Sequence, residues 1–213
     1  MRFHHPFRVN LQLPVEVYRV AHDDFAAELT ELHRKFGVPR RVDFAAEMLP
    51  DEFSLVQRSV GRGRYHDVTI FIHHQGKFVV IEKHAYARTG ILRAPSGGAM
   101  ANESLIDAAK REAREETGFE IEVERFMLES HVQLTLKNET VDWVSYVFLA
   151  RVIGGEMVPQ DVKEIAGVHL RSREELLNDI GPLMKASGFG GFDYRAKMTE
   201  AFFTELEAQG IHI

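Results

Sequence analysis

The sequence predicts a mixed α/β domain, and three features of the chain indicate it. From residue 66 onward apolar residues alternate as in β-strands, with Val68, Ile70 and Ile72 on one face. Farther along, Leu105 and Ala109 recur with helical spacing just after a glycine-rich stretch. The chain of 213 residues is 45% hydrophobic and 27% charged, the balance of a globular protein that can bury one sizeable core.

The first 64 residues are predicted to form an extension attached to this core. Residues 8–20 alternate loosely around a proline, which indicates an edge strand or hairpin arm. A helix is expected from Asp23 to Gly37, and a second, short helix at residues 51–60, before Gly61-Arg62-Gly63-Arg64 breaks it. The expected division is an extension, residues 1–64, and a main domain, residues 65–213.

The main domain begins with a hairpin that turns at Gln75-Gly76. A short strand is expected at residues 91–94, and a helix with Asn102 as N-cap and Gly118 just past its end. Strand patterns then cover residues 121–128, 131–136 and 140–153, with a turn at Lys137-Asn138, and helical patterns cover residues 172–180 and 194–209.

Composition excludes several classes of site. The sequence has no cysteine, so neither a disulfide framework nor a thiolate metal site is available, which fits a cytoplasmic protein. We find no signal-peptide pattern and no apolar run long enough to span a bilayer. The formal net charge of -6 makes nucleic-acid binding unlikely, whereas a small anionic substrate fits if a cation is recruited to meet it.

Three carboxylates are predicted to share one patch of the helix after the glycines. Glu112, Glu115 and Glu116 stand at i, i+3 and i+4, within about a 100° arc. Like charges so placed repel one another, and a hard divalent cation, Mg²⁺ or Mn²⁺, would resolve the conflict because both prefer oxygen ligands. The adjoining arc is apolar, so we expect this acidic edge to stay at the rim of the core.

Residues around this patch complete a plausible phosphate site. The fork of Arg111 could hold Glu103 and Glu115 in register by charge-assisted hydrogen bonds. Two adjacent glycines, Gly97 and Gly98, precede the helix, where backbone N–H groups can approach a phosphate and the helix dipole favours an anion.

Residues 97–119 resemble the Nudix box, G-x5-E-x7-R-E-U-x-E-E-x-G-U, in which U is an apolar residue. Every defined position matches: Gly97, Glu103, Arg111, Glu112, Ala113, Glu115, Glu116, Gly118 and Phe119. The resemblance implies a Nudix-like α/β/α sandwich with a mixed sheet at about residues 66–180. It also implies that Glu112, Glu115, Glu116 and the Gly97 carbonyl hold Mg²⁺, while Arg111 orients them and Glu103 and Gly118 are structural.

Residues outside the box are assigned less directly. The resemblance suggests Glu164 as a further ligand or general base, because it stands in a loop after the box; a surface carboxylate is nearly as good a reading. Gly98 and Arg93 are candidate substrate contacts, although an arginine at an exposed strand end is the more common meaning of Arg93. Lys83 is either a pocket residue or a simple polar group at a strand end.

The resemblance implies Mg²⁺-dependent hydrolysis of a diphosphate bond in a nucleoside diphosphate linked to some group X. Nucleotide sugars such as ADP-ribose, dinucleotides and nucleoside triphosphates all stay open as substrates. Two other readings stay open as well: a nucleotide-metabolite sensor that retains the fold, and an interaction module that uses its acidic helix. The extension suggests a homodimer formed through residues 1–60. Its Tyr18, Phe25 and Phe36 could line a subunit interface or one wall of the substrate pocket, although ordinary core packing is the more common role of such residues.

Overall fold

The structure, a computed structural model, describes residues 26–213. The strand expected at residues 8–20 and the predicted helix start at Asp23 lie outside the described residues. From Ala26 onward the predicted first helix is present, and it ends before Gly37, whose positive φ of 92° suits a residue without a side chain.

Within residues 26–213 the strands form one mixed sheet of seven. Its path runs β1 (Arg40–Glu47), β5 (Phe119–Leu136), β6 (Glu139–Gly155), β2 (His66–His74), β3 (Lys77–Lys83) and β7 (Ile165–Arg171), with the short β4 (Ser96–Gly97) paired to β2. The β1–β5 and β2–β6 pairs are parallel, and the others are antiparallel. The predicted mixed sheet is therefore confirmed.

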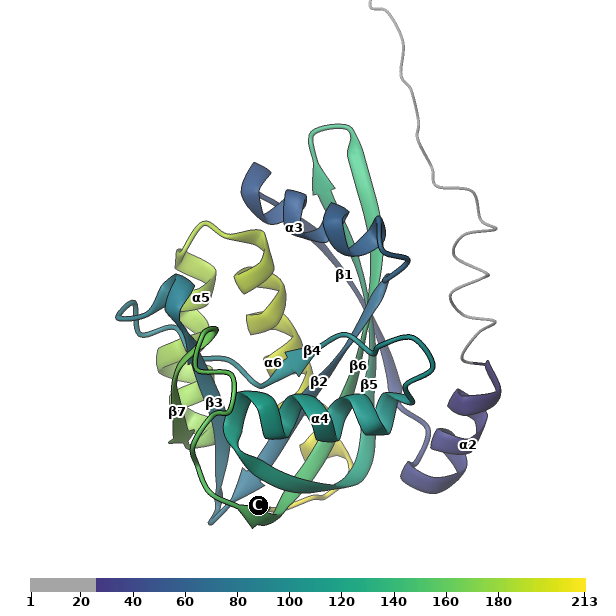
Figure 1. The fold of residues 1–213 in the computed structure, drawn as a ribbon, viewed down its shortest axis with the longest axis vertical. Coiled ribbons are helices and arrows are strands. Elements are labelled where there is room, and N and C mark those ends of the chain that lie inside the picture. The colour runs from purple at the N-terminus through teal and green to yellow at the C-terminus, as the bar shows by residue number, and fades with distance from the viewer. Residues whose placement is uncertain (1–25) are drawn as a thin grey trace, which may run out of the picture.

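Helices cover both faces of this sheet and give the predicted α/β/α layers (Figure 1). One face carries α2 (Ala26–Phe36) and α4 (Leu105–Thr117); the other carries α3 (Pro50–Val60), α5 (Gly181–Ala186) and α6 (Gly190–Ala208). Two short helices, η1 (His84–Tyr86) and η2 (Glu175–Ile180), join these layers to the strands. None of the helices in residues 26–213 is long and apolar enough to cross a membrane.

The segment before residue 65 is built into both layers of the core. On one face Leu29, Leu32 and Phe36 of α2 pack in the same buried cluster as Leu105 and Ala109 of α4. On the other face, Phe53 of α3 belongs to the cluster that contains the buried residues of α6. Phe36 is thus a core residue; Tyr18 and Phe25 lie outside the described residues.

Strand β1, which the sequence analysis did not include, runs parallel to β5 at the edge of the sheet. Of its eight residues only Ala46 is buried, because an edge strand is open to solvent along one side and carries charged residues there. Such a strand lacks the apolar signal of a central strand.

Two other predictions were wrong in detail. Residues 91–94 form no regular strand, only an isolated bridge between Ile81 and Arg93; the regular pairing comes at Ser96–Gly97. The helix expected at residues 172–180 is a π-helical turn, η2, followed by α5. Pro182 stands at the start of α5 and has no N–H, and the N–H of Gly181 bonds to Leu176 five residues back.

Strands β2 and β3 diverge, and the segment from Arg93 to Gly97 fills the space between them. They pair only near their turn, where Ile72, His73 and His74 of β2 face Val79, Phe78 and Lys77 of β3. Farther on, Arg93 exchanges both backbone hydrogen bonds with Ile81 of β3, while Ser96 and Gly97 pair with β2. This insertion brings the glycine pair beside the acidic edge of α4.

Helix α4 begins two residues later than the predicted N-cap indicates. Ser104 is the N-cap, and its hydroxyl accepts a hydrogen bond from the backbone N–H of Asp107 at 3.0 Å. Asn102 instead has a positive φ of 63° and belongs to the preceding turn. At the other end, Gly118 takes the left-handed conformation at φ 80°, as predicted for a residue that ends a helix.

Candidate active site

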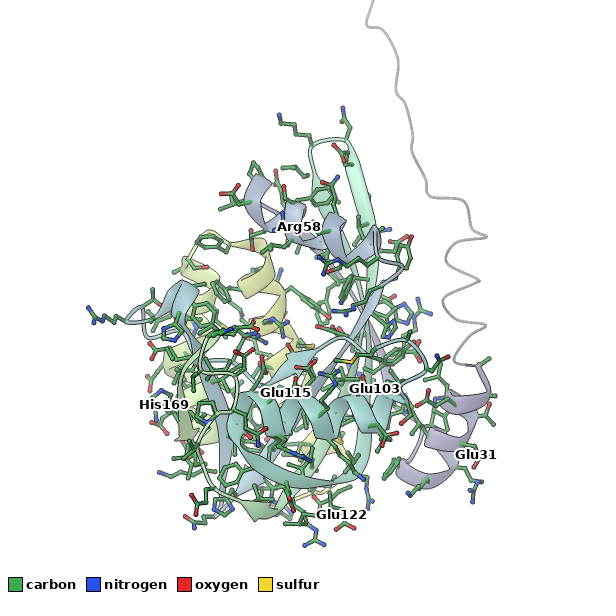
Figure 2. The ribbon with its side chains drawn as sticks, viewed as in Figure 1. Glu31, Arg58, Glu103, Glu115, Glu122 and His169 are labelled. Atoms are coloured by element: carbon green, nitrogen blue, oxygen red, sulfur yellow. The ribbon has the colours of Figure 1, made fainter. Side chains whose placement is uncertain are left out.

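The guanidinium of Arg111 gathers the acidic side chains at the exposed edge of α4. Its Nε and Nη2 donate to the two oxygens of Glu103 at 2.8 and 2.9 Å. Its Nη1 donates to Glu112 at 2.7 Å and to Glu115 at 3.0 Å. Glu103 precedes α4 and Glu115 lies near the end of it; both are labelled in Figure 2. One arginine therefore joins the two ends of the helix.

The glycine pair is held directly against this cluster. The carbonyl of Gly98 accepts a hydrogen bond from Nη2 of Arg111 at 3.0 Å. A Cβ atom on Gly97 would overlap all three atoms of the Glu112 carboxyl group, and one on Gly98 would overlap the Arg64 side chain. Glycine at position 97 thus allows the close approach of the Glu112 carboxylate and does not serve a positive φ.

The Glu112 carboxylate is short of positive charge. Burial raises the pKa of Glu112 above its ordinary value, and the repulsion from Glu116 and Glu115 adds to that shift, although Arg111 opposes it. By contrast, hydrogen bonds from Arg111 lower the pKa of Glu103. One arginine therefore satisfies Glu103 but not the whole group, and a further cation would stabilise Glu112.

Glu116 is buried, contrary to the expectation that the whole acidic edge stays at the rim. Only 4% of its surface is exposed. Its carboxylate accepts a hydrogen bond from the backbone N–H of Ser96 at 2.8 Å, and Nζ of Lys83 lies 2.8 Å from its other oxygen. These two donors compensate for the loss of water, which is why a carboxylate can be held inside.

Glu164 lies close to the same group. Its carboxylate pairs with the ammonium of Lys83, which therefore bridges Glu116 and Glu164. The backbone carbonyl of Glu164 also accepts a hydrogen bond from His84 N at 3.0 Å, so the loop before β7 is tied to the end of β3. Lys83 is thus part of this charged cluster and not a simple polar group at a strand end.

Arg93 is also buried, with 8% of its surface exposed, so the reading of an exposed strand-end arginine was wrong. Its Nη1 donates to Ser96 Oγ at 2.5 Å and its Nε to Tyr86 Oη at 3.1 Å. Its Nη2 lies 3.7 Å from Glu116. These partners hold Arg93 behind Glu116, at the side facing η1.

Sequence reasoning missed a second arginine on this side. Nη2 of Arg195, on α6, lies 3.5 Å from a carboxylate oxygen of Asp67, whose other oxygen accepts a hydrogen bond from Ser145. Burial lowers the pKa of Arg195, and the nearby positive charge of Arg93 lowers it further. No local pattern could have found this contact, because 128 residues separate its partners.

The donor set fits a hard divalent cation by its chemistry. Glutamate oxygens from α4, Glu164 and a backbone carbonyl at Gly97 are the ligand types that Mg²⁺ and Mn²⁺ prefer. In residues 26–213, however, no three acidic or histidine side chains converge as a finished metal site, since Arg111 and Lys83 pair with these carboxylates. The half-buried Glu112, whose pKa is raised by burial and by its acidic neighbours Glu116 and Glu115, is the residue that favours a further cation.

An open hollow of about 530 Å³ lies beside Arg111 and Glu115. That volume falls within the range of small-molecule sites. Charged side chains of both signs line it, together with two isoleucines and a glutamine: Glu103, Asp107, Lys110, Arg111, Arg114, Glu115, Glu120, Ile121, Ile153 and Gln160.

Comparison with known proteins agrees with this geometry. The family model described as the NUDIX domain matches residues 63–187, more than half of the chain. The chain belongs to the Nudix family. The match includes the whole Nudix box, and it confirms the predicted enzyme class, a Nudix pyrophosphohydrolase. No curated protein matches the sequence.

Solved structures with this fold cover most of the Nudix chain. A structure named as a UDP-X diphosphatase has a TM-score of 0.52 and 16% identity, covering 90% of this chain and 83% of its own. A NUDIX hydrolase from Nitrosomonas europaea has a TM-score of 0.50 and 18% identity, covering 70% of this chain and 92% of its own. At these identities the likeness is one of fold.

Proposed function

We propose that this Nudix protein hydrolyses the diphosphate bond of a nucleoside diphosphate linked to a group X, with Mg²⁺ as cofactor and Mn²⁺ as a possible substitute. One observation carries the proposal. Arg111 holds Glu112 and Glu115 of the Nudix box together, directly against the Gly97–Gly98 turn. A carboxylate group that lacks positive charge thus adjoins backbone that a phosphate can approach closely.

Each residue has a separate part in this proposal. Glu112, Glu115 and Glu116, with the Gly97 carbonyl, would hold the cation, and Glu164 would serve as a further ligand or as general base. Arg111 and Glu103 keep the ligands in register, and Gly98 lies against the phosphates. When bound, the cation would lower the pKa of the attacking water and neutralise charge on the leaving phosphate.

The contacts of Arg93 and Lys83 support positioning roles. Arg93 meets Ser96, Tyr86 and Glu116, so its guanidinium has a partner on every side and holds the Glu116 carboxylate in place. Whether Arg93 also touches substrate remains a prediction. Lys83 lies between Glu116 and Glu164 and would move to a substrate phosphate once a divalent cation takes over those carboxylates.

The fold likeness supports a nucleoside diphosphate derivative as the substrate class. The solved structure that covers 90% of this chain is named as a UDP-X diphosphatase, an enzyme for substrates of this kind. Nucleotide sugars such as ADP-ribose, dinucleotides and nucleoside triphosphates all contain the required bond. The net charge of -6 argues against long nucleic acids.

A panel assay tests this proposal. Phosphate-containing products are measured from nucleotide sugars, dinucleotides, nucleoside triphosphates and capped RNA, with Mg²⁺ and with chelator. Glu115→Gln should remove most turnover while the protein stays folded, and Glu103→Gln should reduce it much less. Comparable losses of turnover in both variants would contradict the assignment of Glu115 as a metal ligand and Glu103 as a structural residue. If no substrate is cleaved, the reading as a nucleotide-metabolite sensor is favoured.

We further propose a cytoplasmic homodimer that uses the segment before residue 65. Three large apolar side chains of that segment are exposed in the single chain: Val38 at 75%, Leu55 at 59% and Leu49 at 42%. Apolar groups so exposed are typical of contact surfaces. Sedimentation of the full chain, compared with Leu55→Glu, tests this: a monomer in both would contradict the dimer.

A further inference from the structure

We propose that the surface between η1 and α6 binds the nucleobase of the substrate, which stacks on an aromatic strip formed by Tyr86, Phe192 and Phe189. The inference rests on the proposed function, because it assumes a nucleotide whose phosphates lie at Glu116. It assigns the base to segments outside the Nudix box.

The three rings form a continuous series that ends in solvent. Tyr86 and Phe192 meet edge to face with centroids 5.0 Å apart, and Phe192 meets Phe189 in the same way at 5.8 Å. Tyr86 and Phe192 are half-buried, whereas Phe189 is 42% exposed. An exposed phenylalanine at the end of such a series offers a flat apolar surface to a planar ligand.

The other end of the strip reaches the catalytic carboxylates. Tyr86 Oη accepts a hydrogen bond from Arg93, and Arg93 lies beside the metal-ligand candidate Glu116. A short series of direct contacts therefore leads from the exposed ring to the proposed metal site. Under this proposal, a base on Phe189 or Phe192 and a phosphate near Glu116 would be the two ends of one nucleotide.

Charge along this surface suits the same ligand. Arg195 follows Phe192 by one helical turn, and the pKa shifts of Tyr86 and Arg195 place its positive charge near both Tyr86 and Arg93. Its carboxylate partner Asp67 is 3.5 Å away, beyond the usual length of a charge-assisted hydrogen bond. A substrate phosphate between the base and Glu116 would therefore meet Arg195, whose side chain is 22% exposed.

The start of α6 offers rings here but not free N–H groups. The N–H groups of Gly190 and Gly191 donate to the Glu52 carboxylate at 3.1 and 2.9 Å. These two N–H groups are therefore not available to bind an anion. The side chains of Phe189 and Phe192 would recognise the ligand instead. Since every base has a π-face, stacking alone would accept purines and pyrimidines.

Phe189→Ala tests the proposal because the side chain is exposed and the protein should fold normally. We expect KM for a nucleotide sugar to rise about tenfold, in the range that loss of one base–aromatic stack produces, with kcat within about twofold. For 5-phosphoribosyl 1-diphosphate, which has a diphosphate but no base, KM should not change. Phe189→Trp should restore the wild-type KM, and Ile213→Ala, which removes a side chain of 39% exposure, is the matched control.

Binding is measured separately, so that failure of hydrolysis is not confused with failure of the base site. Saturation transfer to the base protons of AMP and UMP is compared between wild type and Phe189→Ala, with ribose 5-phosphate as the competitor that lacks a base. Transfer that disappears in the variant supports the site even for a protein that cleaves nothing on the panel. Equal transfer in both proteins, an equal KM change for both diphosphates, or a loss of dimer in Phe189→Ala would overturn it.

Discussion

Exchanging the two neighbouring glycines of the Nudix box for alanine, one at a time, should separate metal binding from folding. A Cβ on Gly97 would stand on the Glu112 carboxyl group, whereas a Cβ on Gly98 would meet the Arg64 side chain. Neither glycine has a positive φ, so alanine adds no backbone strain at either position. The two variants therefore differ in which side chain must move.

The displacement can be estimated from the contact geometry. Carbon and oxygen atoms that are not bonded settle at roughly 3.5 Å, so Glu112 must retreat by about 1.5 Å in Gly97→Ala. Metal–ligand distances tolerate only about 0.2 Å. We therefore expect Mn²⁺ affinity to fall by at least about 100-fold in Gly97→Ala and by less than about threefold in Gly98→Ala.

Mn²⁺ affinity is measured from the electron paramagnetic resonance signal of free Mn²⁺, in the absence of substrate. The free energy of unfolding is measured by urea denaturation, in the absence of metal. Loss of the Glu112–Arg111 hydrogen bond should cost about 1–3 kcal/mol in Gly97→Ala, which leaves a folded protein. Wild-type Mn²⁺ affinity in Gly97→Ala would refute the assignment of Glu112 as a ligand. An equal loss in Gly98→Ala would mean that the loop, not the carboxylate, controls the site.

Three further substitutions test contacts that hold the site elements together. Glu28→Ala removes the acceptor of the Leu105 N–H bond at the start of α4 and should lower the free energy of unfolding, measured in urea, by about 1 kcal/mol. Two controls should stay within about 0.5 kcal/mol of wild type: Glu28→Gln, which keeps an acceptor oxygen, and Glu31→Ala, whose side chain is exposed. Glu52→Ala leaves three backbone N–H groups without their acceptor and should cost about 2–3 kcal/mol by the same measurement; a loss below 1 kcal/mol would mean that water replaces the carboxylate. Burial raises the pKa of Tyr194 to about 12, so between pH 10 and 12 this tyrosine ionises only in the unfolded state. The free energy of unfolding of the wild type should therefore fall over this pH range by at most about 2–3 kcal/mol, and Tyr194→Phe should lack that part of the loss.

Local patterns in the sequence predicted much of helix α4. The spacing of Glu103 and Arg111 already indicated the contact that the structure contains, although Glu103 makes it from the turn before α4 and not from the helix itself. The left-handed conformation of Gly118 likewise follows from a glycine after a periodic segment. The error at Asn102 has a local cause: asparagine and serine both commonly cap helices, Ser104 follows Asn102 by two residues, and it is Ser104 that bonds to Asp107.

Burial of charge could not be predicted from local patterns. Arg93 and Glu116 are buried because the chain inserts residues 93–97 between β2 and β3, and that insertion depends on pairings with both strands. Similarly, β1 pairs with a strand about 90 residues away in the sequence. Apolar and polar residues alternate too weakly along β1 for a strand to be predicted from its own residues. Such features arise from tertiary contacts, which a single sequence read locally does not contain.

The segments on either side of the family match complete the site. The NUDIX match covers residues 63–187, whereas α2 and α3 precede it and the aromatic residues of α6 follow it. A carboxylate from each of the preceding helices binds backbone N–H groups at the start of a later one: Glu28 at α4 and Glu52 at α6. Under our proposals the metal chemistry rests on the Nudix box, while the placing of α4 and α6 and the recognition of the base depend on residues outside the family match. Substrate preference should therefore change with Phe189 and Arg195 while Mn²⁺ affinity does not, a separation that the same Mn²⁺ titration applied to Phe189→Ala can reveal.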